Sequence, residues 1–309
     1  MSKTAFVFPG QGSQTVGMLD AMAAKYPSIL ASFEEASDAI GFDLWAVVKE
    51  GPLEDLNHTA ITQPAMLTAS VAIWREYLNQ GGETPALMAG HSLGEYSALT
   101  CAGVFSLGDA AKLVHERGNF MQEAVPDGAG SMAAIIGLAD EKVVELCEEV
   151  AEGQVVAAVN FNSPGQVVIA GHAEAVRRAI KACKPKGARM GMPLPASVPC
   201  HCSLMLDAAE KLAEQLAATT MSEPSIPVIN NIDVVAESDT KAISNALIRQ
   251  LSGPVRWTET VQLLQKEGVE TLVECGPGKV LSGLTKRIDK SLQGVVVNTP
   301  DDLVALLNK

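Results

Sequence analysis

The sequence contains no long apolar run and few aromatic residues. No stretch of about eighteen consecutive apolar residues occurs, so no transmembrane helix is expected. Phe, Trp and Tyr make up only 4% of the chain, and the core must therefore be built mainly from aliphatic side chains and Met. The residues from Met1 to Thr4 lack the charged, apolar and cleavage regions of a signal peptide. We therefore expect a cytoplasmic protein without membrane contacts.

Basic residues are scarce relative to acidic ones. The 309 residues include 23 Lys and Arg against 36 Asp and Glu, which gives a formal net charge of −13. Because a phosphate backbone requires a basic surface, this balance argues against a nucleic-acid-binding protein. Apolar residues form 47% of the chain, a share typical of a soluble globular protein with a sizeable core.

Motifs for metal ions and nucleotides are absent or incomplete. The six cysteines form no C-x-x-C pair, and Cys200-His201-Cys202 is spaced too closely to converge on one tetrahedral ion. The loop Gly10 to Gln14 has Thr15 where G-x-G-x-x-G requires its last glycine, and Cys275 to Lys279 lacks the first glycine of a Walker loop. We expect no metal ion and no cofactor. The first loop is instead predicted to present backbone amides near a catalytic site.

One motif, Gly90-His91-Ser92-Leu93-Gly94, indicates nucleophilic chemistry. An apolar run precedes this G-x-S-x-G sequence and a helix-forming run follows it, which is the order of a nucleophile elbow. In such an elbow the serine sits at a sharp turn, and the amide of the next residue lies at a helix N-terminus. The alternative is an ordinary turn whose serine caps the helix.

The predicted elements indicate an α/β fold with an inserted module. Helices are expected from about Pro27 to Glu50 and from Thr62 onward, between buried strands. The buried strands are predicted at residues 5–8, 86–89, 226–229 and 271–274. From about 128 to 194 the order changes to β-α-β-β-α-β, which is typical of a ferredoxin-like module. We expect a large domain of residues 1–126 and 197–309 around a parallel sheet, and a small domain of residues 127–196.

A serine nucleophile needs a base, and the chain has five histidines. His91 lies inside the elbow and is badly placed to reach the neighbouring hydroxyl. His201 follows a proline-rich loop and precedes a helix, a placement often found for catalytic residues, but a structural role is also open. Arg117 lies on a predicted helix, where an arginine is usually a solvated charge.

Seven motifs follow one another along the chain: Phe8 to Gln14, Thr62 to Ala65, Gly90 to Glu95, Arg117-Gly118, Asn160 to Ser163, Val198 to His201 and Glu274 to Gly278. In this order they resemble the malonyl-CoA:acyl carrier protein transacylase family, and the resemblance runs nearly from end to end. It is greater for the free-standing bacterial enzymes of fatty-acid synthesis than for domains of polyketide megasynthases. The family fold implies an α/β-hydrolase-like large domain with a ferredoxin-like insert.

The resemblance implies a catalytic pair. Ser92 would be the nucleophile and His201 its base, with the main-chain carbonyl of Gln250 orienting the histidine in place of an acid. One departure from the family pattern is Cys200, which stands where the family commonly has serine. We expect this near-isosteric change to alter the pocket only slightly.

The resemblance also implies how the acyl group is bound. The backbone amides of Gln11 and Leu93 would form an oxyanion hole, and Arg117 would bind the free carboxylate of the malonyl group. The reaction would be a ping-pong transfer from malonyl-CoA to the phosphopantetheine thiol of acyl carrier protein.

The expected partner, acyl carrier protein, is usually acidic, so an acidic chain must dock it through local basic patches. One candidate is the pair Lys286 and Arg287, with Lys279 and Lys290 nearby. The other is the basic cluster of the insert, although each could simply be a solvated helix face. That cluster consists of Arg177, Arg178, Lys181, Lys184, Lys186 and Arg189.

Two other functions remain open. A serine esterase or thioesterase would use the same serine and histidine, would not need Arg117 at the acyl site, and would release its acyl group to water. A non-catalytic carrier-binding protein could retain the fold without forming a covalent adduct.

Overall fold

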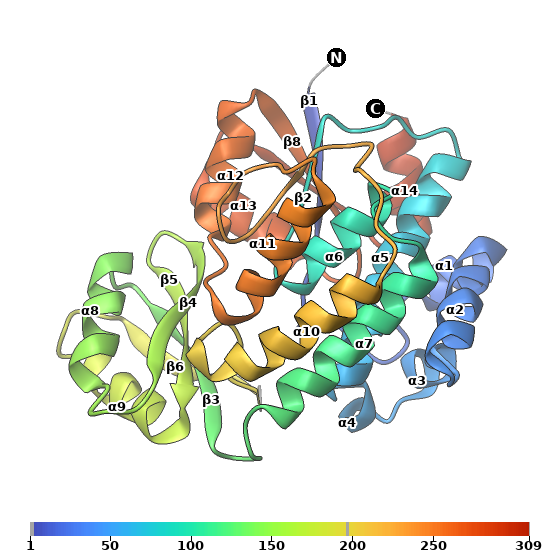
Figure 1. Cartoon of the computed structure of the whole chain (residues 1–309). Coiled ribbons are helices and arrows are strands. Elements are labelled where there is room, and N and C mark those ends of the chain that lie inside the picture. Colours follow the sequence, from blue (N-terminus) through green and yellow to red (C-terminus); the bar gives the residue numbers. More distant parts are fainter. Residues whose placement is uncertain (1–2, 196–197, 309) are drawn as a thin grey trace.

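The computed structural model describes residues 3–195 and 198–308, and the predicted domain boundary at 196/197 falls outside these ranges. The fold is mixed α/β, with a parallel sheet and a separate antiparallel sheet (Figure 1). None of the helices described is both long enough and apolar enough to cross a membrane.

The larger part of the molecule is built on a five-stranded parallel sheet of order β7-β2-β1-β8-β9. Along the central strand, Phe6 and Phe8 pack into one core while Ala5 and Val7 pack into another on the opposite face. A strand buried on both faces must be apolar throughout, which explains the run in the sequence. The strands are β1 (Lys3–Phe8), β2 (Leu87–Gly90), β7 (Val228–Ile229), β8 (Val269–Cys275) and β9 (Gln293–Val297).

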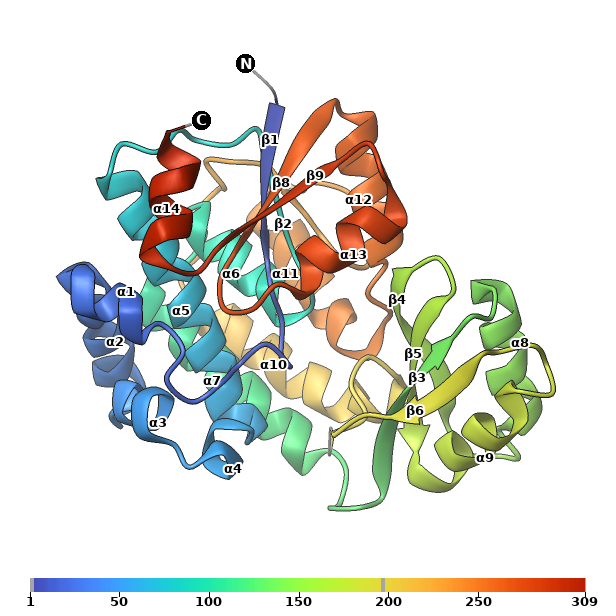
Figure 2. The ribbon, with the colours of Figure 1, turned by 180° about the vertical axis from the view of Figure 1, so that it is seen from behind.

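Helices cover both faces of this sheet (Figures 1 and 2). The core that contains Phe6 and Phe8 also takes in the buried faces of α5, α6 and α7, whereas α12 and α13 pack on the opposite side. The helices are α1 (Asp20–Lys25), α2 (Pro27–Ile40), α3 (Leu44–Glu50), α4 (Leu53–Leu56), α5 (Thr59–Asn79), α6 (Leu93–Cys101), α7 (Leu107–Glu123), α10 (Leu206–Ala218), α11 (Thr240–Ser252), α12 (Trp257–Lys266), α13 (Val280–Ile288) and α14 (Pro300–Leu307), with a 3-10 turn η1 at Ser203–Met205.

Two helix predictions need correction. The single helix expected from Pro27 to Glu50 is two helices, because Gly41 adopts a left-handed conformation (φ 84°) that ends α2. Asp43 then starts α3 by accepting a hydrogen bond from the amide of Ala46. The next predicted helix begins at Thr59 rather than Thr62.

The segment 128–194 forms the antiparallel sheet, of order β4-β5-β3-β6, with α8 and α9 packed on one face (Figure 2). The predicted order β-α-β-β-α-β is observed, although the last strand is shorter than the expected 188–194. The elements are β3 (Gly130–Ile136), α8 (Asp140–Val150), β4 (Val156–Ser163), β5 (Gln166–His172), α9 (Ala173–Cys183) and β6 (Met190–Pro193).

Strand β4 connects the antiparallel-sheet part of the molecule to the parallel-sheet part. The amide of Val255 donates to the carbonyl of Val159 (2.8 Å), and the amide of Phe161 donates to the carbonyl of Val255 (3.0 Å). Asn162, at the end of the same strand, is hydrogen-bonded to the imidazole of His91 (2.8 Å). The insert is therefore attached directly beside the G-x-S-x-G turn.

Candidate active site

Ser92 lies in a strained turn between β2 and α6. Its backbone has φ 53° and ψ −109°, a conformation that side chains rarely adopt. The flanking glycines permit this turn because they have no Cβ: a Cβ on Gly90 would lie only 1.9 Å from the carbonyl of Gly94. A Cβ on Gly94 would lie 2.0 Å from the carbonyl oxygen of Phe8. The turn has the strand–turn–helix form that the sequence predicts, pressed against β1.

The hydroxyl of Ser92 meets the imidazole of His201. Ser92 Oγ lies 2.7 Å from His201 Nε2, and His201 Nδ1 lies 2.8 Å from the main-chain carbonyl of Gln250. Because a carbonyl only accepts, Nδ1 carries the proton and Nε2 can accept the proton of Ser92. Burial, with the charge of Arg117 and a smaller effect of His91, lowers the pKa of His201 to about 3. The imidazole is therefore neutral and available as a base.

Helix capping does not account for Ser92. It occupies the N-cap position of α6, but its side chain makes no capping hydrogen bond. Three of the other four histidines contact different groups: His91 contacts Asn162, His115 the carbonyl of Ala60, and His172 the amide of Val155.

Arg117 is completely buried, so the interpretation of a solvated charge is wrong for this residue. From α7 its Nη1 donates to Gln63 Oε1 (2.7 Å), and its Nη2 lies 3.2 Å from Gln250 Oε1 and 3.4 Å from Ser92 Oγ. The guanidinium also lies over the ring of Tyr96, 5.2 Å from the ring centroid. Within residues 3–195 and 198–308 it forms no ion pair. A permanent cation with neutral partners beside a nucleophile is suited to an anionic acyl group.

The loop after β1 lies against the Ser92 turn. Phe8 pairs with Gly90 in the sheet, and a Cβ on Gly10 would lie 2.6 Å from the carbonyl oxygen of His91. The next residue in this loop is Gln11. Among the residues that the structure describes, the backbone amides of Gln11 and Leu93 donate to no acceptor.

Two residues that sequence reasoning missed hold the turn. Asn231, which follows β7 and is fully buried, accepts from the amide of Ser92 and donates to the carbonyl of Gly90, both at 2.7 Å. Glu95 Oε2 accepts from the amide of Asn231 (2.8 Å) and from Gln250 Nε2 (2.9 Å). The available signal was the Asn230-Asn231 pair after a strand, since polar residues at the carboxyl edge of a parallel sheet often serve the site there.

Cys200 is not a competing nucleophile. Its thiol bonds the carbonyl of Val198 (3.4 Å), and burial raises the pKa of Cys200 to about 11. Since the thiolate is the reactive form, this side chain remains an inert neighbour of His201.

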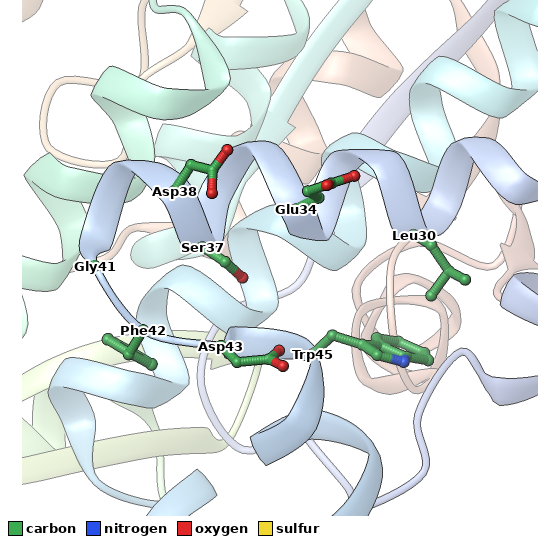
Figure 3. A pocket seen from close by; sticks show the side chains of 8 residues that line it. All are labelled: Leu30, Glu34, Ser37, Asp38, Gly41, Phe42, Asp43 and Trp45. Atoms are coloured by element: carbon green, nitrogen blue, oxygen red, sulfur yellow. The ribbon is translucent and has the colours of Figure 1, made fainter.

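A cavity of about 630 Å³ opens elsewhere, between α2 and α3 (Figure 3). It shares no residue with the site at Ser92. In the described part of the chain, no group of three or more His, Cys, Asp or Glu side chains could hold a metal ion. The lining residues are Leu30, Glu34, Ser37, Asp38, Gly41, Phe42, Asp43 and Trp45.

Comparison with known proteins shows which family the chain resembles. The sequence model of the acyl transferase domain family matches residues 5–300. Malonyl CoA-acyl carrier protein transacylases of Salmonella typhimurium and Escherichia coli K12 are 61% and 60% identical over 309 and 307 residues, covering 100% and 99% of both chains. A crystal structure of an acyl carrier protein S-malonyltransferase from Vibrio cholerae matches with a TM-score of 0.97 and 59% identity, over 99% of this chain and 100% of that one. A malonyl-transacylase solved in complex with its type II PKS acyl carrier protein matches with a TM-score of 0.98 and 56% identity, over 100% of both chains.

Proposed function

The chain belongs to the acyl transferase family, and from this premise we propose that it moves a malonyl group from malonyl-CoA to the phosphopantetheine thiol of an acyl carrier protein. The reaction supplies malonyl units for fatty-acid synthesis and passes through a malonyl ester of Ser92. The observation that carries this assignment is His201 Nε2 at 2.7 Å from Ser92 Oγ, with Nη2 of the buried Arg117 at 3.4 Å from the same oxygen.

In the first half-reaction, Ser92 Oγ attacks the thioester carbonyl carbon while His201 Nε2 takes the hydroxyl proton. Negative charge develops on the carbonyl oxygen, toward which the amides of Gln11 and Leu93 donate. The carbon–sulfur bond then breaks, and the CoA sulfur leaves with the proton from His201. The product is a malonyl ester of Ser92.

In the second half-reaction, the pantetheine thiol transfers its proton to His201 and attacks the ester carbonyl. Ser92 Oγ leaves and regains the proton. Throughout, the carbonyl of Gln250 fixes the imidazole orientation, which is why no acid residue is needed as a third member. Arg117 pairs with the malonyl carboxylate and so selects the acyl group.

We also propose the finer description of the fold. The parallel-sheet part, residues 1–126 and 197–309, is α/β-hydrolase-like, and residues 127–196 form a ferredoxin-like domain. The β-α-β-β-α-β order and the separate core of the insert support this division. All six cysteines are free thiols, which fits work in the reducing cytoplasm.

Covalent loading tests the proposed function. After brief exposure to malonyl-CoA, the intact protein is expected to gain the mass of one malonyl group, and carrier protein with its pantetheine arm should discharge it as malonyl-carrier. Discharge at the same rate by water alone, with free malonate as product, would establish the esterase or thioesterase alternative. A protein that never gains the adduct would instead be the non-catalytic carrier-binding protein.

Docking of the acidic carrier is proposed at Lys286 and Arg287. Both side chains are exposed in the last turn of α13, and Arg287 is bonded only to the neutral Gln166 in the described chain. In the Arg177–Arg189 cluster, by contrast, Arg177, Arg178 and Lys186 already pair with glutamates. Half of the cationic side chains of that cluster are thus already balanced by carboxylates, whereas neither Lys286 nor Arg287 is paired with a carboxylate in the described chain, and this difference favours α13.

Reversing both charges, in a Lys286→Glu, Arg287→Glu variant, is expected to raise the apparent KM for carrier protein about tenfold at low salt, because electrostatic attraction accelerates encounter. Loading from malonyl-CoA should be unchanged. Steady-state kinetics with each substrate varied in turn measures both. The matched control is Lys181→Glu, Lys184→Glu in the insert. A larger effect of this control on the carrier KM would move the docking surface there.

A further inference from the structure

Ser92 and Glu95 have the S-x-x-E spacing of a helix capping box, yet neither half of the box forms. The hydroxyl of Ser92 is bonded to His201, and the amide of Ser92 donates to Asn231 instead of to Glu95. The carboxylate of Glu95, which is 2% exposed, is bonded to residues of two other segments. Because Glu95 does not form the local bond expected of a capping box, its contacts in the other two segments must explain why this acid is buried.

The side chain of Gln250 connects Glu95 to Arg117. Gln250 Nε2 donates to Glu95 Oε2 (2.9 Å), and Gln250 Oε1 accepts from Arg117 Nη2 (3.2 Å). The amide therefore directs its oxygen at the cation and its nitrogen at the anion, so that both contacts are favourable. Glu95 acts on Arg117 at the distance of one amide group, without forming an ion pair with it.

Arg117 has contacts of unequal strength. The bond from Nη1 to Gln63 is short (2.7 Å), whereas Nη2 makes longer contacts with Gln250 and Ser92. Longer hydrogen bonds are weaker, so an incoming carboxylate can replace these two contacts with the smallest loss of free energy. A direct carboxylate partner would block this position.

We propose that Glu95 is a positioning residue that tunes the selection of the acyl group, because it balances the charge of Arg117 through Gln250 and leaves Nη2 open to the substrate carboxylate. This inference rests on the proposed role of Arg117. Ionised Glu95 weakens the hold on a malonyl carboxylate by repulsion, and neutral Glu95 strengthens it. An acetyl group, which has no charge, is indifferent to Glu95.

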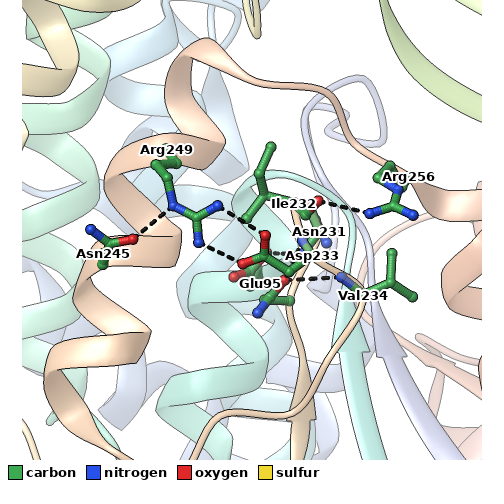
Figure 4. A network of polar contacts seen from close by, with 9 residues as sticks. Glu95, Asn231, Ile232, Asp233, Val234, Asn245, Arg249 and Arg256 are labelled. Carbon is green, nitrogen blue, oxygen red and sulfur yellow. Dashed lines mark hydrogen bonds and ion pairs between the residues drawn. The ribbon is translucent and has the colours of Figure 1, made fainter.

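The surroundings of Glu95 bring its ionisation into an experimentally accessible pH range. Burial raises the pKa of Glu95 to about 7, even though the hydrogen bonds from Gln250 and Asn231 and the charge of Arg117 act to lower it. Asp233, beyond Asn231, raises it further, and Asp233 itself pairs with Arg249 (Figure 4). Since an acid with a raised pKa ionises as the pH rises through that value, the negative charge at Glu95 grows between about pH 6 and 8.

The first test uses the unaltered protein. Its KM for malonyl-CoA is expected to rise about fivefold to tenfold relative to that for acetyl-CoA between pH 6 and 8.5, because ionised Glu95 repels the malonyl carboxylate across the Gln250 amide. Both substrates keep the same ionisation in this range, apart from the shared CoA groups, which cancel in the ratio. A ratio that stays constant across the range would overturn the proposal without any variant being made.

The second test uses Glu95→Gln, which retains an acceptor for Asn231 and Gln250 but cannot ionise. The variant is expected to match the parent at pH 6, to have a KM for malonyl-CoA about fivefold lower at pH 8.5, and to show no pH dependence of the ratio. The matched control is Glu76→Gln, a buried carboxylate on α5 that bonds Ser28 and Gln80. It should retain the parental profile.

A purely structural role of Glu95 predicts a different outcome, in which Glu95→Gln lowers kcat for both acyl groups equally and keeps the parental pH profile. That result overturns the proposal. It is distinguishable from failure of the proposed function, because in that case Arg117→Ala would retain its preference for malonyl whatever substitution is made at position 95.

Discussion

Replacing Ser92 with alanine is expected to lower the rate of malonyl transfer by about 10⁴-fold or more and to leave no covalent adduct. The hydroxyl is the atom that forms the ester, and no other group described near His201 can replace it, since the thiol of Cys200 is held protonated. Stopped-flow or quenched-flow transfer from labelled malonyl-CoA measures the rate, and intact mass detects the adduct.

The control for this variant lies on the same helix. Ser97 is buried in α6, and its hydroxyl has no hydrogen-bond partner among the described residues. Ser97→Ala should therefore load malonyl at the parental rate and unfold at nearly the parental temperature. A malonyl adduct on the Ser92→Ala protein would mean that the acyl group is carried elsewhere, and the mechanism proposed for this site would be wrong.

Arg117→Ala is expected to remove the preference for malonyl over acetyl groups. Truncating one partner of a buried, charge-assisted pair costs about 2–5 kcal/mol, which corresponds to a loss of roughly 30-fold to several-thousand-fold in kcat/KM for malonyl-CoA. Transfer of acetyl, which has no carboxylate, should change far less. Competition between the two acyl-CoA substrates, with mass detection of the acyl-enzyme, measures the ratio directly.

The same substitution also empties a fully buried position and leaves Gln63 without the donor that it holds at 2.7 Å. Thermal unfolding must therefore be measured beside selectivity. Arg75→Ala is the control, because it removes a guanidinium from an exposed ion pair with Glu35 on α2. An Arg117→Ala protein that is folded and still prefers malonyl would show that the carboxylate is bound by another group.

The strand, the turn and the helix around Ser92 could be predicted because all three are local features of the sequence. The insert could be predicted for the same reason, from the alternation of short strands and amphipathic helices. The single helix expected over 27–50 was wrong because periodicity continued across Gly41, where the backbone turns left-handed.

Other parts of the site depend on contacts that no local pattern contains. The amide of Leu93 follows from the elbow itself, which places it at the helix N-terminus. Gln11 and Gln250 were identified only through the family resemblance, because their expected roles use backbone groups that every residue type has. Glu95 and Asn231 are separated by 136 positions in the sequence, and only the folded sheet brings them together. The positive φ angles of Ser92 and His201 are likewise imposed by the surrounding packing.

The position of β1 in the middle of the sheet has a consequence for biosynthesis. β1 is synthesised before both of its neighbours in the sheet, since β2 begins at Leu87 and β8 begins only at Val269. Until then one edge of an apolar strand is unpaired, a state that invites aggregation. The parallel sheet that supports the Ser92 turn is therefore complete only after β8 and β9 have been made.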